Sequence, residues 1–583
     1  MTQKLMTPGV YIREESAFPG SVVEVATAIP AFIGYTDIAS RNGKSLNNEP
    51  TRITSFAEYR LLFGGAFNAK FSLDDTAKDV YEHKITINDQ EKYINYKTDN
   101  DAFLFKAISL FYQNGGGTCY IVSVGTYRDK EKVEVKKEEL ETGLDTLLKE
   151  QEPTMVVIPD AVKLKDKCYN VYVNVLAHCA KMQSRVAILD IYDGYKDRIR
   201  DKTDIIKKFR GNIGTENLNY AAAYYPWLHT SIVQNSDITY ENLVPSDDDA
   251  AVATDTVDSA AAGEPATTPT DDVSTTAGEP ATSEGNAFQT FLASILKEPK
   301  AQKVIEDFYK PEEPVTTEDA TTVDDTAGDP AATTDTATTD DSATTDEVAV
   351  VLTPEQIAQK LAVKKRNFHL GLIATSPTYS NLLNEITAVM NLLPPSSAMA
   401  GIYTQVDNSR GVWKAPANIS INNVVKPASN ITHDDQEDLN VDAISGKSIN
   451  AIRTFPGIGT LVWGGRTLDG NSLDWKYINV RRTIIMLEQS IKLALRAYVF
   501  EPNDSNTWVT VKSMIINFLT DKWKQGALAG SSPEDAFDVQ LGLGSTMTSL
   551  DILEGRMLVS IKLAIVRPAE FIVVTFQQQM QKS

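Results

Sequence analysis

The sequence is poor in cysteine and histidine, and this scarcity excludes several kinds of site. Its 583 residues contain three cysteines, Cys119, Cys168 and Cys179, in no spacing typical of a metal centre. A low, odd cysteine count is typical of a reducing compartment. The five histidines, at positions 83, 178, 229, 369 and 433, include no pair at ligand spacing. We therefore expect no metal and no cofactor.

Long hydrophobic runs are also absent. No stretch of about 18 apolar residues is present, which is the length that a membrane-spanning helix needs. Met1 to Leu5 leads directly to Pro8 and Gly9 without the apolar core of a signal peptide. We expect a protein that is assembled in the cytoplasm and does not insert into a membrane.

Two tracts, 246–287 and 314–350, contain no lysine or arginine. Each contains ten acidic residues, and together they account for most of the net charge of −22. The rest of the chain is close to neutral, at about −2, so its bulk charge does not favour nucleic-acid binding.

The composition of these tracts indicates an acidic, low-complexity surface insertion over 246–350. Alanine, threonine, aspartate and proline dominate it, and such segments bury too little apolar surface to offset chain entropy. Between the tracts, apolar residues follow the helical period at Phe288, Phe291, Leu292, Ile295 and Leu296. We expect one central amphipathic helix that docks on the main body.

Around this insertion, predicted strands and helices alternate as in an α/β domain. Strands are predicted over 154–159, 185–190 and 219–225, with a helix over 169–182. After the insertion we expect a helix from Thr353, a strand over 369–374 and a helix over 381–393. The alternation predicts a mostly parallel sheet with helices on both faces.

The C-terminal part predicts a smaller α+β domain. Strands are expected over 459–464, 537–541 and 556–566, and helices over 480–498 and 506–523. The predicted organisation is an N-terminal arm at 1–22, an α/β domain at 23–245 and 351–454, the insertion, a C-terminal domain at 455–566, and a C-terminal arm at 567–583.

Both ends of the chain carry strand-like segments without a local partner. Near the C-terminus, apolar side chains occupy both faces of a predicted strand, which should therefore be buried on both sides; they are Phe571, Ile572, Val573, Val574 and Phe576. Val10, Tyr11 and Ile12 form the centre of a similar segment near the N-terminus. We predict that both segments complete sheets in neighbouring copies of the chain.

No catalytic motif is complete. Gly-Lys-Ser occurs at 43–45 and 446–448 without the earlier glycine of a phosphate-binding loop, and no Gly-x-Ser-x-Gly elbow is present. Asp160 and Asp190 end predicted strands, where α/β enzymes often place their sites. A hydrolase-like enzyme is therefore one alternative, and a surface or adhesion module with the acidic tract as a stalk is another. The pair Arg481-Arg482, at a helix start, is more typical of an ion pair or an interface.

Seven segments in order resemble the contractile tail sheath family. The most specific is Ala400-Gly-Ile-Tyr-Thr-Gln-Val-Asp-Asn-Ser-Arg-Gly-Val-Trp-Lys-Ala-Pro-Ala-Asn418. The others are 7–14, 27–35, 222–227, 455–468 followed by 477–482, 500–508 and 567–572. The acidic insertion departs from the family pattern.

The resemblance implies a subtilisin-like, non-catalytic middle domain, an inner C-terminal domain, and terminal arms that pair with sheets of adjacent subunits. It implies no enzyme but a structural subunit that forms stacked hexameric rings or a helix around an inner tube. Contraction would drive that tube through a target envelope. Expected partners are further copies, the inner tube protein, the baseplate and terminator or cap proteins. The particle would be a phage tail, a tailocin or an extracellular contractile injection system made in a bacterial cytoplasm.

Overall fold

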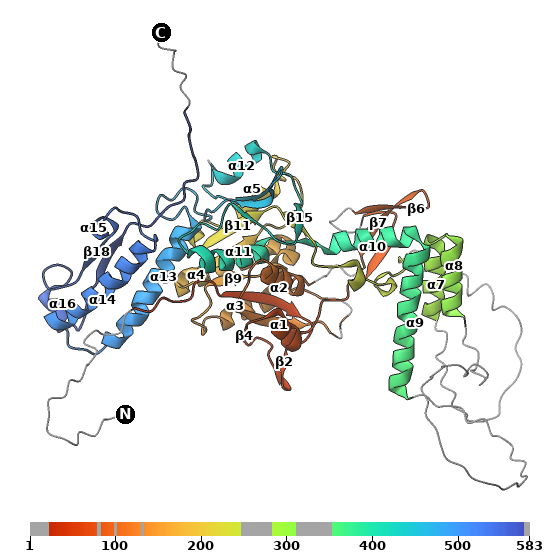
Figure 1. Cartoon of the computed structure of the whole chain (residues 1–583), viewed down its shortest axis with the longest axis horizontal. Coiled ribbons are helices and arrows are strands. Elements are labelled where there is room, and N and C mark those ends of the chain that lie inside the picture. Colours follow the sequence, from red (N-terminus) through yellow and green to blue (C-terminus); the bar gives the residue numbers. More distant parts are fainter. Residues whose placement is uncertain are drawn as a thin grey trace, which may run out of the picture. The chain divides into compact units, whose positions relative to one another are not determined.

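The computed structural model describes residues 22–77, 83–97, 102–128, 130, 133–246, 283–310, 353–442 and 444–575. The chain forms two compact units (Figure 1). The first comprises Met1–Ala69, Thr98–Gln234 and Thr387–Ser583, and the second comprises Lys70–Lys97 and Asn235–Ile386. The domain boundaries expected from the sequence stay a prediction.

The first unit is built on a nine-stranded sheet in the order β14-β17-β16-β11-β10-β9-β1-β8-β4. Its six central strands, from β16 to β8, pair in parallel, and β14, β17 and β4 pair antiparallel. The mostly parallel sheet agrees with the prediction. The strands are β1 (Pro30–Thr36), β4 (Thr51–Ile53), β8 (Cys119–Thr126), β9 (Met155–Val157), β10 (Val186–Asp190), β11 (Ala221–Tyr225), β14 (Ile419–Ser420), β16 (Asn450–Phe455) and β17 (Gly459–Trp463).

Helices cover both faces of this sheet. The ring of Phe32 in β1 lies 5.1 Å from that of Phe111 in α2 (Leu104–Gln113). A Cβ on Gly143 of α3 (Lys137–Thr146) would lie 2.8 Å from Ile33, the next residue of β1. Neighbouring residues of a strand point to opposite faces, so α2 and α3 lie on opposite sides. The other main helices of the unit are α1 (Phe56–Phe63), α4 (Cys168–Met182), α5 (Ile205–Asn212), α11 (Ser396–Arg410) and α12 (His433–Asn440).

The C-terminal part of the first unit packs two long helices against a two-stranded sheet. The helices are α13 (Ile478–Leu495) and α14 (Ser505–Lys524), and the strands are β18 (Phe537–Gln540) and β19 (Ser560–Leu563). Their shared core includes Leu487, Val511, Ile515 and Leu519, and it receives Val22 from the N-terminal segment. The strand predicted over 556–566 is shorter than expected. Two short helices, α15 (Pro533–Ala536) and α16 (Ser549–Leu553), complete this part.

In its described residues, the second unit contains a small antiparallel sheet and a cluster of four helices, the last of which ends in the first unit. The sheet has the order β5-β7-β6, with β5 (Phe71–Asp74), β6 (Lys84–Ile87) and β7 (Gln90–Tyr96). The helices are α7 (Ser283–Ile295), α8 (Pro299–Tyr309), α9 (Pro354–Thr375) and α10 (Pro377–Met390). The predicted amphipathic helix is confirmed as α7, but it packs within this unit, where Phe288 contacts Tyr240. The sequence interpretation missed α8.

The strand predicted over 369–374 is wrong, because this stretch is the last part of α9. Phe368 of α9 stacks on Phe308 of α8 with 4.1 Å between ring centroids. Gly371 lets the two helices approach closely, since a Cβ there would lie 3.1 Å from Val304. Packing between helices therefore decides the conformation of a segment that the glycine and apolar residues made look like a strand. Within the described ranges, no helix combines the length and apolar character that a membrane crossing needs.

Candidate strand-exchange surface

The sheet of β18 and β19 lies at the centre of the candidate site. The apolar side chains of one face pack against the core that includes residues of α13 and α14; they belong to residues 557, 559, 561, 563 and 565. Alternate residues such as Leu558, Ser560 and Lys562 are exposed. One face of the sheet therefore packs partly buried against the core and the other faces solvent.

The outer edge of β19 is open. Ala564 donates its N–H to the carbonyl of Ala536, and its own carbonyl accepts from Ala529. Because alternate residues of a strand direct their backbone groups to opposite edges, Ile561 and Leu563 direct theirs away from β18. No other strand of the described chain pairs there. This edge could accept an additional strand.

Beyond β19 the chain is anchored at Glu570. Its carboxylate accepts two hydrogen bonds from Nε of Arg466, at 2.9 and 3.1 Å, and one from Nη2 at 2.6 Å. Asn440 donates to it at 2.9 Å and the hydroxyl of Tyr477 at 3.1 Å. Burial alone would raise the pKa of Glu570, but the hydrogen bonds and charge of Arg466 outweigh it and lower the pKa below its ordinary value.

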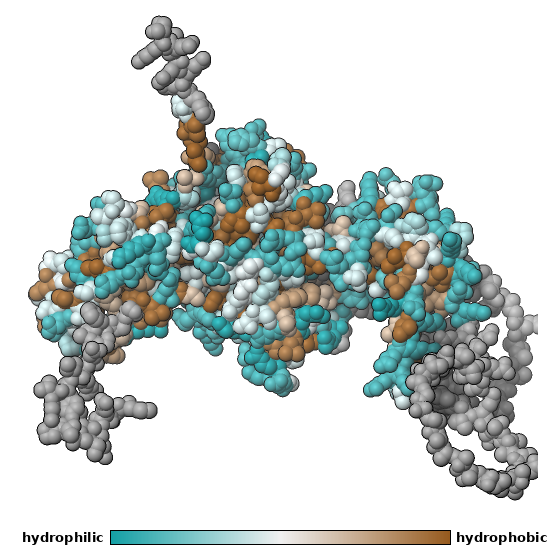
Figure 2. Space-filling model, viewed as in Figure 1, coloured by the Kyte–Doolittle hydropathy of each residue, from teal (hydrophilic) through white to brown (hydrophobic). Residues whose placement is uncertain are grey.

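The apolar segment that follows this anchor is exposed. Phe571, Ile572, Val573 and Val574 have exposed fractions of 73%, 82%, 88% and 65%. They are in no strand or helix, and Figure 2 colours this stretch hydrophobic below the grey C-terminal residues. A run of exposed apolar side chains is typical of an interaction site. Phe576 and the N-terminal residues Val10, Tyr11 and Ile12 lie outside the described residues.

The root of the C-terminal segment borders a hollow of about 870 Å³. Residues 566–572 form one side, and Trp413, Trp463 and Tyr477 contribute to the other. Asn479 fixes the start of this stretch by donating to the carbonyls of Trp413 and Val566 at 2.8 and 3.3 Å.

The two arginines at the start of α13 hold different parts of the first unit together. Arg482 forms a buried bidentate ion pair with Asp407 of α11, at 2.9 and 2.6 Å, and donates to the carbonyl of Thr27 at 2.9 Å. The guanidinium of Arg481 lies 4.0 Å from the ring centroid of Tyr220. The prediction of an ion pair here is confirmed, and it joins segments that individually resemble sheath proteins.

The strand-end carboxylates have structural partners. Asp160 accepts from the backbone N–H of Tyr35 at 3.0 Å and of Phe103 at 2.7 Å. Asp190 accepts from the N–H and hydroxyl of Ser396 at 2.8 and 2.5 Å. Burial raises the pKa of Asp190 to about 7, although the bonds from Ser396 lower it. No histidine, cysteine and carboxylate cluster within the described ranges could hold a metal ion.

Sequence reasoning missed the pairing of Arg466 with Glu570 and the docking of residues 22–27. Arg466 and Glu570 lie in segments that resemble sheath proteins, at 455–468 and 567–572. The resemblance therefore pointed to both segments, but no sequence pattern predicted that these two side chains are in contact. Sequence periodicity could not predict that Val22 packs into the helical core, because a single apolar residue outside any helix or strand forms no repeating pattern.

Comparisons with known proteins agree with the resemblance. A family model, the phage tail sheath C-terminal domain, matches residues 471–579. The tail sheath protein of Burkholderia phage BcepMu is 27% identical over 149 residues, and that of Vibrio phage KVP40 is 28% identical over 129 residues. These matches cover 25% and 22% of this chain and 31% and 19% of those relatives. The chain thus matches less than a third of the length of either curated relative.

Solved structures match over nearly the whole chain. The sheath complex of the extracellular contractile injection system PVC, in its contracted state, has a TM-score of 0.52 at 23% identity and 99% coverage of both chains. The contracted helical sheath of the anti-feeding prophage has a TM-score of 0.52 at 24% identity, with 99% of this chain and 100% of that chain covered. At these identities the likeness shows the fold, which is mixed α/β. The resemblance to contractile tail sheath proteins is confirmed.

Proposed function

We propose that this chain, a homologue of contractile tail sheath proteins, is a structural subunit of a contractile sheath. The subunits polymerise as stacked rings or a helix around an inner tube, and contraction drives that tube through a target envelope. One observation carries the proposal: a single subunit exposes the apolar segment 571–574 and also an open edge at β19. Two such copies are complementary to each other.

Strand exchange between copies is the proposed means of assembly. A segment of one copy that pairs with β19 of another gains several backbone hydrogen bonds, each worth roughly 0.5–1.5 kcal/mol net. It also buries apolar side chains that contribute about 25 cal/mol per Å². The donor and acceptor surfaces of one subunit differ, so the contact is head-to-tail and propagates into rings and helices.

The anchor at Glu570 gives the exchanged strand a defined root. Because residues up to 570 are held by the donor subunit and the exposed segment begins at 571, only a short stretch of chain separates the body of the donor from the exchanged strand. Such a connection lets neighbouring subunits rotate and slide while they stay linked. We include in the proposal the N-terminal arm with Val10, Tyr11 and Ile12, and a non-catalytic, subtilisin-like middle domain.

The partners follow from this role. They are further copies in hexameric rings, the inner tube protein, the baseplate and a terminator or cap protein, and none is a nucleic acid or a membrane. One of the similar structures is a sheath complex and another is a baseplate, which supports a multi-subunit assembly. Assembly would take place in a bacterial cytoplasm, within a phage tail or a phage-tail-like particle. Neither an enzyme nor an adhesion module is favoured by any of the comparisons.

The direct test is the assembly state of the purified chain in negative-stain electron microscopy. We expect tubes with a regular axial repeat, alone or after co-expression with an inner tube protein. Discrete globular particles at every concentration, with and without the tube protein, would contradict the proposal.

A further inference from the structure

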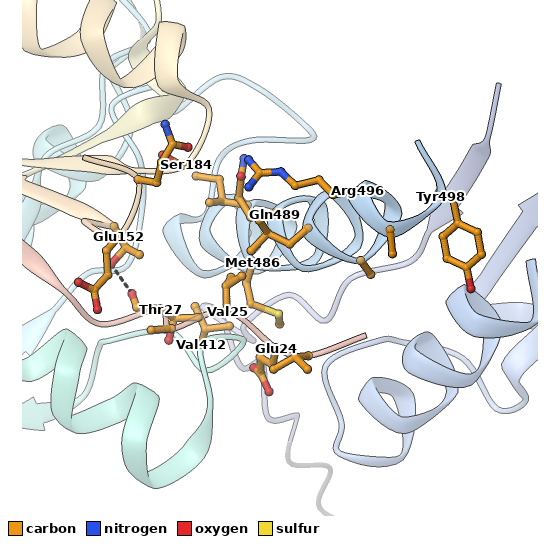
Figure 3. A pocket seen from close by; sticks show the side chains of 18 of the residues that line it. Glu24, Val25, Thr27, Glu152, Ser184, Val412, Met486, Gln489, Arg496 and Tyr498 are labelled. Carbon is orange, nitrogen blue, oxygen red and sulfur yellow. Dashed lines mark hydrogen bonds between the residues drawn. The ribbon is translucent and has the colours of Figure 1, made fainter. Parts of the chain in front are cut away.

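A cleft of about 950 Å³ lies beside the N-terminal segment of the first unit. Val23, Glu24, Val25, Ala26 and Thr27 form one side of it. Figure 3 shows Met486 and Gln489 of α13, with Arg496 just beyond, on another side, and Glu152 and Ser184 on a third. The lining is mainly apolar, and Leu493 of α13, 44% exposed, also contributes.

Residues 22–27 belong to no helix or strand, and hydrogen bonds hold them to the body. The N–H of Val25 donates to Oγ of Ser490 at 3.1 Å, and the carbonyl of Thr27 accepts from Oγ1 of Thr154 at 2.8 Å. Glu24 and Ala26 alternate with Val25 and Thr27 along the chain, so the backbone groups of Glu24 and Ala26 point to the opposite edge. Within the described residues their N–H and C=O groups make no hydrogen bond. The segment therefore presents a free strand edge beside an apolar cleft.

The sequence just before this segment fits that edge. Residues 8–14 alternate as a strand, and Pro19-Gly20 lies between them and residues 22–27. Pro-Gly is a strong turn signal, and the loop of residues 15–21 is short enough for the two segments to pair antiparallel at small entropic cost. Val22 is fixed in the helical core, so residues 8–14 are tethered within reach of the cleft at high effective concentration.

The position of residues 8–14 in the chain, and not their charge, selects them as the occupant. The cleft is lined by the carboxylates of Glu24, Glu152 and Glu501 and by the guanidinium groups of Arg482 and Arg496, and residues 8–14 carry both Arg13 and Glu14. Their tether at Val22 begins at the cleft itself, whereas residues 571–576 follow the anchor at Glu570.

We propose that in the free subunit residues 8–14 add a strand to residues 23–27 of the same chain and fill this cleft. On assembly the segment leaves the cleft and pairs with a neighbouring copy, a step that rests on the proposed function. The arm then has two mutually exclusive positions. The fold-back slows spontaneous polymerisation, because a free subunit must break its own strand pairing before it can join another.

Amide hydrogen exchange of the full-length chain, at concentrations without tubes, tests the cleft-bound position. We expect peptides covering Glu24 and Ala26 to exchange about tenfold or more faster in the Val10→Asp/Ile12→Asp variant than in the unmodified chain. The matched control, Ile572→Asp/Val574→Asp, places the same charges on the other arm and should leave this exchange unchanged. Equal exchange in the unmodified chain and the Val10→Asp/Ile12→Asp variant would overturn the proposal.

Cross-linking identifies which chain occupies the cleft. A Tyr11→Cys/Ala26→Cys variant has two new thiols, while the native cysteines are buried. At high dilution we expect a short bifunctional thiol reagent to link these positions within one chain. Links found only between two chains would mean that a second copy fills the cleft and would refute the fold-back. Neither the exchange nor the cross-linking measurement requires tubes. If normal tubes form but the amides of residues 23–26 are not protected from exchange, only this inference is refuted. If these amides are protected but no tubes form, only the proposed function is refuted.

Discussion

Arg466 holds Glu570 across 104 residues of sequence, with Nη2 of the guanidinium 2.6 Å from Oε2 of the carboxylate. Both side chains are largely buried, with exposed fractions of 5% and 19%. Glu570 is the last anchored residue before the exposed apolar segment 571–574. The ion pair therefore marks where the body of the subunit ends and the proposed exchange strand begins.

Glu570→Gln should weaken both the subunit and its assembly. The substitution leaves the buried guanidinium of Arg466 without its counter-charge, which typically costs about 3 kcal/mol in the free energy of unfolding. Urea denaturation measures this loss, and microscopy should show fewer and shorter tubes. Arg567→Gln is the control, since the Arg567–Asp474 pair is long, at 3.9 Å, and exposed. A loss of equal size in both variants would contradict the role of Glu570.

The effect of Glu570→Gln should depend on pH. The pKa of Glu570 in the folded protein lies below its ordinary value of 4.5, so the folded state favours the ionised carboxylate. Its stabilising contribution is complete above about pH 4.5 and is lost as the pH falls through the folded-state pKa. The difference in unfolding free energy between the unmodified chain and Glu570→Gln should shrink below this pH.

Much of the first unit follows from the sequence, but its long-range contacts do not. The pattern of apolar residues predicts elements such as β10, α4 and α14, because each of them buries one face or is buried throughout. The contact of Arg466 with Glu570 depends on how three separate elements fold together, and no local pattern encodes it. In the second unit, residues 369–374 look like a strand when taken alone. Tertiary packing, including the stacking of Phe368 on Phe308 of the unpredicted helix α8, favours the helical conformation instead.

Val574→Asp should abolish tube formation without unfolding the subunit. Val574 has an exposed fraction of 65%, so an aspartate there remains solvated in the free chain but would be buried in a neighbour's sheet. Ile199→Asp is a matched control, since Ile199 is also apolar and 65% exposed. We expect the control to form normal tubes. Tubes of Val574→Asp, or loss of tubes in both variants, would contradict the strand-exchange surface.

Ile561→Pro should block the acceptor edge of β19. Ile561 directs its N–H away from β18, so proline there removes no hydrogen bond within the subunit. The Ile561 side chain packs partly buried against the helical core, and we expect its loss to cost about 2 kcal/mol of stability. An incoming strand would lose a partner and meet the proline ring. Lys562→Pro, one residue on, removes a bond between β19 and β18 and should destabilise the subunit more. Tubes formed by Ile561→Pro, seen by negative-stain microscopy, would show that the strand enters elsewhere.

Asp190→Asn should remove part of the pH dependence of stability. The pKa of Asp190 is raised from 3.8 to about 7 in the folded state, so between these values the folded protein binds more protons than the unfolded chain. The free energy of unfolding therefore falls as the pH rises across this window, and levels off above about pH 7. Denaturation at pH 4.5 and pH 7.5 should show the variant gaining stability relative to the unmodified chain at the higher pH. A difference that stays constant with pH would mean that Asp190 titrates near its ordinary value.

Deletion of the acidic tracts should leave assembly intact. The variant replaces residues 247–282 and 314–350 with Gly-Ser linkers, and it keeps α7 and α8, whose aromatic residues pack on Tyr240 and Phe368. The deleted residues include no leucine, isoleucine, methionine or aromatic residue, so they can contribute little to a buried interface, and their removal takes away 19 acidic residues. We expect tubes of normal repeat that associate side by side more readily, because the mutual repulsion of their surfaces is reduced. A companion deletion of 283–310, which removes Phe308 from the aromatic cluster, should instead destabilise the second unit. Tubes lost in the tract deletion but retained in the companion would assign the tracts, and not the helices between them, a direct part in assembly.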